Sequence, residues 1–102
     1  MLTIPLKLIT IIGESVLAER LPSALRSLGA TGWTMTDARG DGSRNRRTSA
    51  VPGDNLRLEV VVEEAVADQI LAMLAQDYFP HYALVAWVSE VGVLRGAKYR
   101  RA

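Results

Sequence analysis

The sequence predicts an α+β domain in the order β-α-β-loop-β-α-β, which is the ferredoxin-like split βαβ pattern. Two segments with a helical spacing of apolar residues alternate with strand-like segments, and a long segment poor in apolar residues separates the second strand from the third. The chain has 102 residues, 49% of them hydrophobic, which suits a single domain spanning 1–102. We expect the second and third strands to pair through the loop that joins them.

The first half of the chain carries a strand and a helix. Residues 4–12 alternate and then end in an apolar run, which is typical of a central strand. Residues 14–28 follow a helical period, and Gly29 is expected to end that helix. Pro22 lies inside it and lacks the amide proton that an internal helical position needs. Either the helix kinks there or a short turn precedes a helix restarting at Pro22; the unbroken apolar stripe favours the kink.

The second strand and the loop come next. Residues 32–39 are rich in Trp, Thr and Met, which favours a strand. Residues 40–55 combine glycines, a proline and asparagines with few apolar side chains, which indicates a long loop. Loops of this length are uncommon in small domains and are usually functional or disordered.

The second half repeats the strand–helix–strand pattern. Residues 56–62 alternate as a strand with one face in the core. Glu63 and Glu64 open a helix, where acidic side chains favour the positive end of the helix dipole, and residues 78–80 end it. Residues 82–89 form a nearly continuous apolar run, interpreted as a fourth strand buried on both faces, and a basic, glycine-punctuated tail follows.

Composition excludes several classes of function. The net charge of +1 does not indicate a general nucleic-acid binder. The absence of cysteine rules out disulfides and thiolate metal sites. The apolar N-terminal segment is too short to cross a bilayer and lacks the flanks of a secretion signal. We therefore expect a cytoplasmic location.

Catalytic chemistry has little support in the sequence. The single histidine, His81, has no obvious partner, and capping or surface packing is its expected role. Adjacent glutamates such as Glu63 and Glu64 point to different sides of a helix and cannot act as an acid–base pair. No metal-ligand spacing is present, and Ser43 has no nearby base. The sequence predicts no catalytic residue, no metal site and no prosthetic group.

The strongest chemical signal is the segment of residues 40–49, which combines glycines, hydroxyls and arginines. Glycine lets the backbone approach a ligand closely, and arginine presents a planar, charged fork that matches phosphate oxygens. Backbone amides at a strand end can also form an anion nest. The spacing is not that of a P-loop, since no Gly-Lys-Ser/Thr ending and no helix follow. We interpret the segment as a phosphate-binding loop, although a merely solvated arginine cluster stays possible.

Two aromatic residues could stack on a nucleobase. Trp33 precedes the second strand's threonines, and Tyr82 begins the apolar run of the fourth strand. Packing in the core is at least as good an explanation for each of them.

With these motifs in view, nearly the whole chain resembles the PII signalling proteins. The segment 29–34, Gly-Ala-Thr-Gly-Trp-Thr, resembles the approach to PII strand two. The segment 40–49, Gly-Asp-Gly-Ser-Arg-Asn-Arg-Arg-Thr-Ser, resembles the loop base of the SbtB branch, Gly-x-Gly-Ser-Arg-Asn-x-Arg-Ser. Tyr82-Ala83 followed by residues 93–96 is similar in spacing to the C-terminal half of SbtB. A carboxysome-associated PII branch is a close neighbour that the sequence does not separate from SbtB.

The resemblance implies a homotrimer with a long T-loop between strands two and three. Clefts between its subunits would bind adenine nucleotides, namely AMP, ADP, ATP and cyclic AMP, as effectors. Such proteins regulate inorganic-carbon uptake through a bicarbonate transporter at the cytoplasmic membrane face. The resemblance therefore implies a non-enzymatic signalling protein, with a small ferredoxin-like enzyme or a purely structural interaction module as alternatives.

The resemblance also assigns residues to the nucleotide site. Ser43, Arg44 and Arg47 would contact phosphate, while Gly40 and Gly42 would shape the loop.

The adenine cleft would be lined by Thr34 and by the backbone of residues 82–85, which include Ala83 and Leu84. Two features depart from the family. The chain has no cysteine for the redox tail of some SbtB proteins, and its loop lacks the tyrosine that classical PII proteins modify.

Overall fold

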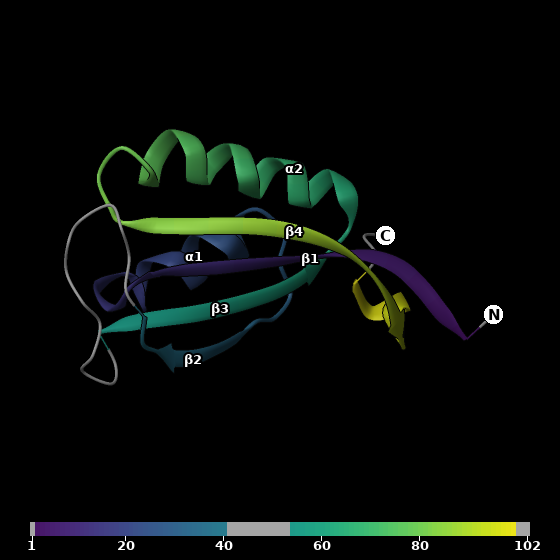
Figure 1. Cartoon of the computed structure of the whole chain (residues 1–102). Helices are drawn as coiled ribbons and strands as arrows, with labels where there is room; N and C mark the ends of the chain where they lie inside the picture. Colours follow the sequence, from purple (N-terminus) through teal and green to yellow (C-terminus); the bar gives the residue numbers. More distant parts are fainter. Residues whose placement is uncertain (1, 41–53, 100–102) are drawn as a thin grey trace.

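A computed structural model describes residues 2–40 and 54–99. It contains one antiparallel sheet of four strands in the order β2-β3-β1-β4 (Figure 1). The α+β ferredoxin-like fold predicted from the sequence is therefore confirmed. The strands are β1 (Thr3–Glu14), β2 (Thr34–Ala38), β3 (Asn55–Val62) and β4 (Leu84–Leu94).

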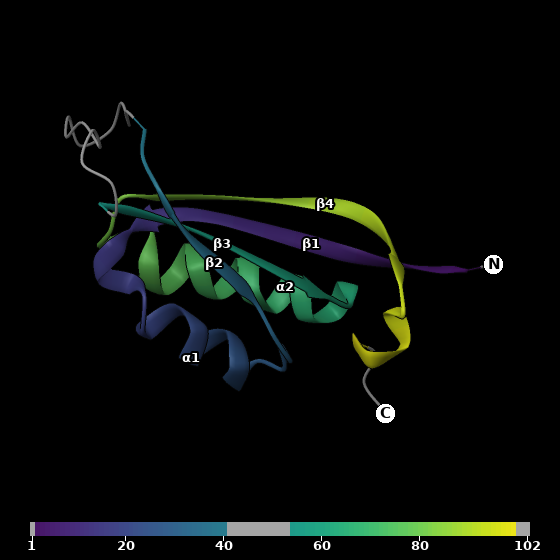
Figure 2. The ribbon, with the colours of Figure 1, turned by 90° about the horizontal axis from the view of Figure 1, so that it is seen from below.

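Both α-helices lie against the same face of the sheet, so neither α1 nor α2 covers the opposite face (Figures 1 and 2). Glu64 lies in the first turn of α2, as predicted for an acidic residue at a helix start. A π-helical turn continues α2, and 3-10 turns follow β1 and β4. The elements are η1 (Ser15–Leu17), α1 (Arg20–Ser27), α2 (Glu64–Met73), η2 (Leu74–Tyr78) and η3 (Gly96–Tyr99).

The core lies between the sheet and the two helices. Side chains alternate across a strand, so every second residue of β1 and β3 points toward the helices. Ile9 and Ile11 of β1 and Leu58 of β3 are fully buried there, together with Leu25 of α1 and Ile70 of α2. The predicted pairing of the second and third strands across the long loop is also confirmed, with Ala38 opposite Asn55.

The predicted helix over residues 14–28 is wrong at its start. Glu14 still belongs to β1, a 3-10 turn follows, and α1 begins only at Arg20. Pro22 is the third residue of α1, where its missing amide proton has no intrahelical acceptor to lose. The helix therefore accommodates Pro22 in its first turn, and the interpretation as a kinked helix is incorrect. The alternative of a short preceding turn is confirmed, except that the helix restarts at Arg20 and not at Pro22.

Gly29 ends α1, as predicted. Its φ is 111°, a left-handed value that favours glycine. The amide of Gly29 donates to Arg26 O and the amide of Ala30 donates to Leu25 O, both at 3.1 Å. This pair of hydrogen bonds is the Schellman motif, which satisfies the last carbonyls of a helix.

The fourth strand differs from its prediction in length and burial. β4 continues to Leu94, so the first residues of the expected tail belong to the strand. Its outer face is not buried in the chain, since Val85 is 52% and Trp87 43% exposed. An apolar run predicts burial on both faces, but the helices cover only one. Beyond β4, η3 folds back so closely that a Cβ at Gly96 would lie 2.8 Å from the Ile4 Cβ.

Candidate functional site

Strand register gathers several residues at the end of the sheet where the long loop begins and ends. Asn55 of β3 pairs with both Ala38 of β2 and Glu14 of β1, and Gly13 pairs with Leu84 of β4. We call this end of the sheet the loop-base end and define it by four residues, namely Gly40, Asp54, Glu14 and Ala83. Residues 41–53 lie between two of its members.

Glu14 joins two parts of the loop-base end. Its Oε2 accepts a hydrogen bond from the Ala83 amide at 2.8 Å. The next amide, that of Ser15, donates to the Asp54 carbonyl oxygen at 3.1 Å. The end of β1 is thus tied to the start of β4 on one side and to the chain preceding β3 on the other.

Glu14 was not identified from the sequence, because the predicted helix over residues 14–28 includes it. The one available signal was its place directly after Gly13, a glycine in an otherwise apolar strand. The structure explains that glycine, because a Cβ there would lie 3.1 Å from the Leu84 Cβ. Glycine therefore permits the close approach of β1 and β4 beside Glu14.

The residues expected to line an adenine cleft lie on opposite edges of the sheet. Thr34 is exposed on β2, whereas Ala83 and Leu84 are half-buried at the start of β4. Two strands separate these edges, which corresponds to about 14 Å across the sheet. Thr34 is also displaced from Ala83 along the strand direction. Thr34 pairs with Glu59, Glu59 pairs with Thr10, and Thr10 pairs with Trp87, which follows Ala83 and lies on β4. Thr34 and Ala83 therefore lie far apart within one chain.

Gly40 is exposed, and its described neighbours would leave room for a larger side chain. Among the residues that the structure describes, a Cβ at this position would meet no atom within 4 Å, and the φ of Gly40 is not in the left-handed region. The other residues assigned to phosphate contact and loop shape, namely Gly42, Ser43, Arg44 and Arg47, lie outside the residues that the structure describes.

Tyr82 contacts Arg20 and Tyr78 of the same chain, so its ring is not free to stack on a nucleobase. Nη1 of Arg20 donates to its hydroxyl, and the same guanidinium lies 5.8 Å from its ring centroid. The Tyr78 ring lies 5.9 Å away, tilted by 36°. Burial raises the pKa of Tyr78, and the charge of Arg20 opposes this rise. The cluster joins α1 to the connection between α2 and β4.

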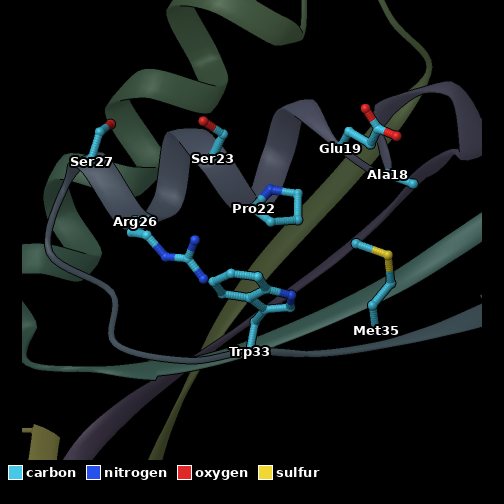
Figure 3. A pocket seen from close by; sticks show the side chains of 8 residues that line it. All are labelled: Ala18, Glu19, Pro22, Ser23, Arg26, Ser27, Trp33 and Met35. Atoms are coloured by element: carbon cyan, nitrogen blue, oxygen red, sulfur yellow. The ribbon is translucent and has the colours of Figure 1, made fainter.

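Trp33 lines a groove of about 540 Å³ between α1 and β2 (Figure 3). The Arg26 guanidinium carbon lies 4.5 Å from the Trp33 ring centroid, so one face of the indole is already occupied. Trp33 also packs against the core cluster. Of the two interpretations left open for this residue, the structure supports packing within the chain.

The single histidine and an exposed ion pair of β3 have ordinary surroundings. His81 is exposed, and its amide donates to the Tyr78 carbonyl oxygen at 3.0 Å. Glu59 pairs with Arg57 at 3.1 Å. Within residues 2–40 and 54–99, no group of three or more His, Asp or Glu side chains could hold a metal ion. No helix in that same part of the chain is long and apolar enough to span a membrane.

The four-stranded sheet with both helices on one face is the fold of the PII-like proteins. Residues 6–98 match the sequence model of the family described as nitrogen regulatory protein P-II, and the chain belongs to that family of signalling proteins.

Two proteins of known structure illustrate the likeness. A PII-like signalling protein of Thermus thermophilus is 48% identical, with a TM-score of 0.85, and the match covers 98% of this chain and 100% of that one. CPII of Thiomonas intermedia, solved with ADP and bicarbonate, is 25% identical, with a TM-score of 0.84 and coverage of 96% and 97%. Another CPII structure, solved with ADP, AMP and acetate, is 24% identical with a TM-score of 0.85, covers 99% and 100%, and speaks for the fold alone.

Proposed function

We propose that this chain is a nucleotide sensor that binds AMP, ADP, ATP or cyclic AMP in clefts between the subunits of a homotrimer. The observation that carries the proposal is the separation of Thr34 and Ala83 on opposite edges of one sheet. A cleft formed by the β2 edge of one subunit and the loop-base end of the next would bring them together. The nucleotide would act as a reversible effector rather than as a substrate or a prosthetic group.

The open face of the sheet supports the assembly. Alternation places apolar side chains of three strands on this face, and neither α1 nor α2 covers them. These residues are Leu8, Ile12, Val61, Val85, Trp87 and Val91. An uncovered apolar face on a small domain marks a protein–protein interface, and cyclic symmetry would bury it in every subunit.

The arginines of the loop motif would hold the phosphates. Arg44 and Arg47 would form charge-assisted hydrogen bonds with phosphate oxygens, Ser43 would add a hydroxyl, and Gly42 would let the backbone approach. Gly40 would keep the end of β2 free of a side chain, in accord with the empty space around it.

The proposed output is control of inorganic-carbon uptake. A trimer whose surface depends on the bound nucleotide could engage a bicarbonate transporter at the cytoplasmic face of the membrane, as the SbtB resemblance suggests. The protein would be cytoplasmic and would reach the membrane only through that partner.

A second candidate is a carboxysome-associated PII protein that binds ADP or AMP together with bicarbonate. The CPII structure solved with ADP and bicarbonate favours it, although that likeness is at 25% identity. In this case the nucleotide site would stay the same and bicarbonate would be a second ligand.

Isothermal titration calorimetry tests the proposal. The purified protein would be titrated with AMP, ADP, ATP and cyclic AMP, each with and without bicarbonate. Saturable binding of at least one nucleotide at one site per subunit is expected. Bicarbonate-dependent affinity for ADP or AMP would favour the second candidate. No binding of any nucleotide at millimolar concentration would overturn the nucleotide-sensor function and leave a structural interaction module.

A further inference from the structure

We propose that Arg20 is a positioning residue of the nucleotide site, which acts through Tyr82 on the backbone that lines the adenine cleft. This inference rests on the proposed function, because the backbone of residues 82–85 lines a cleft only if a nucleotide binds there. It adds a side chain of α1 to the site. It concerns the affinity for the adenosine part of the nucleotide and not for its phosphates.

The connection between η2 and β4 is held by a few individual contacts. Residues 79–83 precede β4 and lie outside its strand ladder. The Tyr82 amide donates to the Tyr78 carbonyl oxygen at 3.0 Å. The Ala83 amide donates to Glu14 Oε2 at 2.8 Å. The position of this segment therefore depends on its anchors and not on a continuous sheet.

Arg20 supplies the anchor from α1. Its Nη1 donates to the Tyr82 hydroxyl, and its guanidinium carbon lies 5.8 Å from the centroid of the Tyr82 ring. The buried Tyr78 ring contacts the same ring, with 5.9 Å between the centroids. A hydrogen bond from a charged donor is stronger than one between neutral groups. The side chain of Tyr82 is thus fixed on two sides, and this limits the freedom of the backbone that carries it.

The place of Arg20 in α1 does not favour the helix itself. Arg20 is the first residue of α1, and the first turn of this helix contains no acidic side chain. Glu19 at the N-cap makes no capping hydrogen bond through its side chain. Because the N-terminus of a helix carries partial positive charge, a cation there is unfavourable. Departures from such local rules are expected at functional sites. The contact with Tyr82 gives this arginine a role that helix stability does not.

The anchor affects binding because a cleft that is already ordered binds its ligand more tightly than one that the ligand must order. Without the hydroxyl bond, the Tyr82 side chain and the backbone after it gain conformational freedom, which nucleotide binding must then remove. This cost concerns the adenosine part of every nucleotide. The affinities for AMP, ADP and ATP should therefore fall by one common factor, whereas the loss of a phosphate contact affects ATP most.

A purely structural role for Arg20 makes a different prediction. In that case the contact only fastens α1 to the connection before β4. Its loss then lowers the free energy of unfolding and leaves the nucleotide affinity of the folded protein unchanged.

Three variants that keep the net charge separate the two roles. Tyr82→Phe keeps the ring and removes the hydroxyl. Arg20→Lys keeps a cationic donor but loses the planar fork of the guanidinium. The matched control is Tyr78→Phe, which makes the same chemical change in the neighbouring ring and leaves the hydrogen bond between Arg20 and Tyr82 in place.

The experiment measures the binding of AMP, ADP and ATP to wild type and the three variants by calorimetry, without divalent cations. Thermal denaturation establishes that each variant is folded. We expect Tyr82→Phe to bind all three nucleotides about three- to tenfold more weakly than wild type, which is part of the free energy of a hydrogen bond to a charged group. Arg20→Lys should show a smaller loss that is also common to the three nucleotides. Tyr78→Phe should bind them as wild type does.

Each other outcome contradicts the proposal in its own way. Normal binding by a folded Tyr82→Phe variant overturns the positioning role and leaves the nucleotide function intact. A loss that grows from AMP to ATP also overturns it, because the anchor then acts on the phosphates. An equal loss in Tyr78→Phe means that any loosening of the cluster weakens binding, which removes the specific role of Arg20. If Tyr82→Phe does not fold, Arg20→Lys decides, and its unchanged affinity overturns the role. Absence of binding to all four proteins overturns both proposals.

Discussion

The guanidinium of Arg26 lies over the indole of Trp33, with 4.5 Å between its central carbon and the ring centroid. Arg26 belongs to the last turn of α1, and Trp33 lies just before β2. Figure 3 shows the pair across the groove between helix and strand. This contact therefore fixes the end of α1 against the edge of the sheet, and it engages an aromatic residue that could otherwise have been a base-stacking platform.

Replacing Arg26 by Ala should lower the free energy of unfolding, because the cation–π contact with Trp33 is lost. The coupling between the two residues should be about 0.5–1 kcal/mol, the range for a half-exposed pair. A double-mutant cycle with Arg26→Ala and Trp33→Leu, measured by urea denaturation at fixed protein concentration, checks this. Strictly additive effects of the two substitutions would contradict the contact.

Gly96→Ala should destabilise the protein, because its Cβ would lie 2.8 Å from the Ile4 Cβ. Relief requires η3 to move away from β1, and overpacking of this kind costs about 1–3 kcal/mol. The matched control is Gly40→Ala, whose Cβ meets nothing within 4 Å. Thermal denaturation of both variants should show a lower Tm for Gly96→Ala alone. A lower Tm for Gly40→Ala as well would mean that glycine is required for another reason.

Trp87→Glu should convert the proposed trimer into monomers, because it places a charge on the apolar open face of the sheet. Size-exclusion chromatography with light scattering at micromolar concentration measures the mass directly. Gln69→Glu on the helical side of the fold adds the same charge away from that face and should leave the trimer unchanged. A monomeric wild type under these conditions would refute the assembly.

Much of the fold could be predicted because its signals are local. The alternation in residues 56–62 and the stripe of α2 each follow from the burial of one face. Gly29 marked the end of α1 because few other residues adopt its φ of 111°. The pairing of β2 with β3 followed from their order around the loop.

The errors have one physical cause, since each depended on contacts distant in sequence. Glu14 continues β1 because β3 extends equally far and pairs Asn55 with it, which the apolar stripe after Glu14 does not reveal. The apolar run of β4 predicts burial of both faces of the strand, although the helices lie against only one face of the sheet. The position of Thr34 relative to Ala83 depends on the order of the strands, and sequence motifs contain no such distance.

Replacing Arg44 or Arg47 by Ala should weaken nucleotide binding by about 1.5–3 kcal/mol each, the range for a hydrogen bond to a charged group. Arg46 occupies the variable position of the motif, so Arg46→Ala should have a smaller effect and serves as the matched control. Calorimetry with the nucleotide that wild type binds most tightly measures the difference. Equal losses at all three positions would indicate a diffuse basic patch instead of a shaped phosphate site.

We propose residues 48–54 as the contact with the bicarbonate transporter of the proposed function. Deleting them should therefore abolish binding to that transporter. Thermodynamic linkage adds a second expectation: a nucleotide that weakens the complex must bind the complex less tightly than the free trimer. Co-purification from membranes with AMP, ADP, ATP or cyclic AMP present tests both, with wild type and the deletion variant compared in each nucleotide. The variant must retain the trimer mass and nucleotide affinity of wild type, so that a loss of co-purification reports on docking alone. If such a variant co-purifies as well as wild type in every nucleotide state, the loop is not the docking surface.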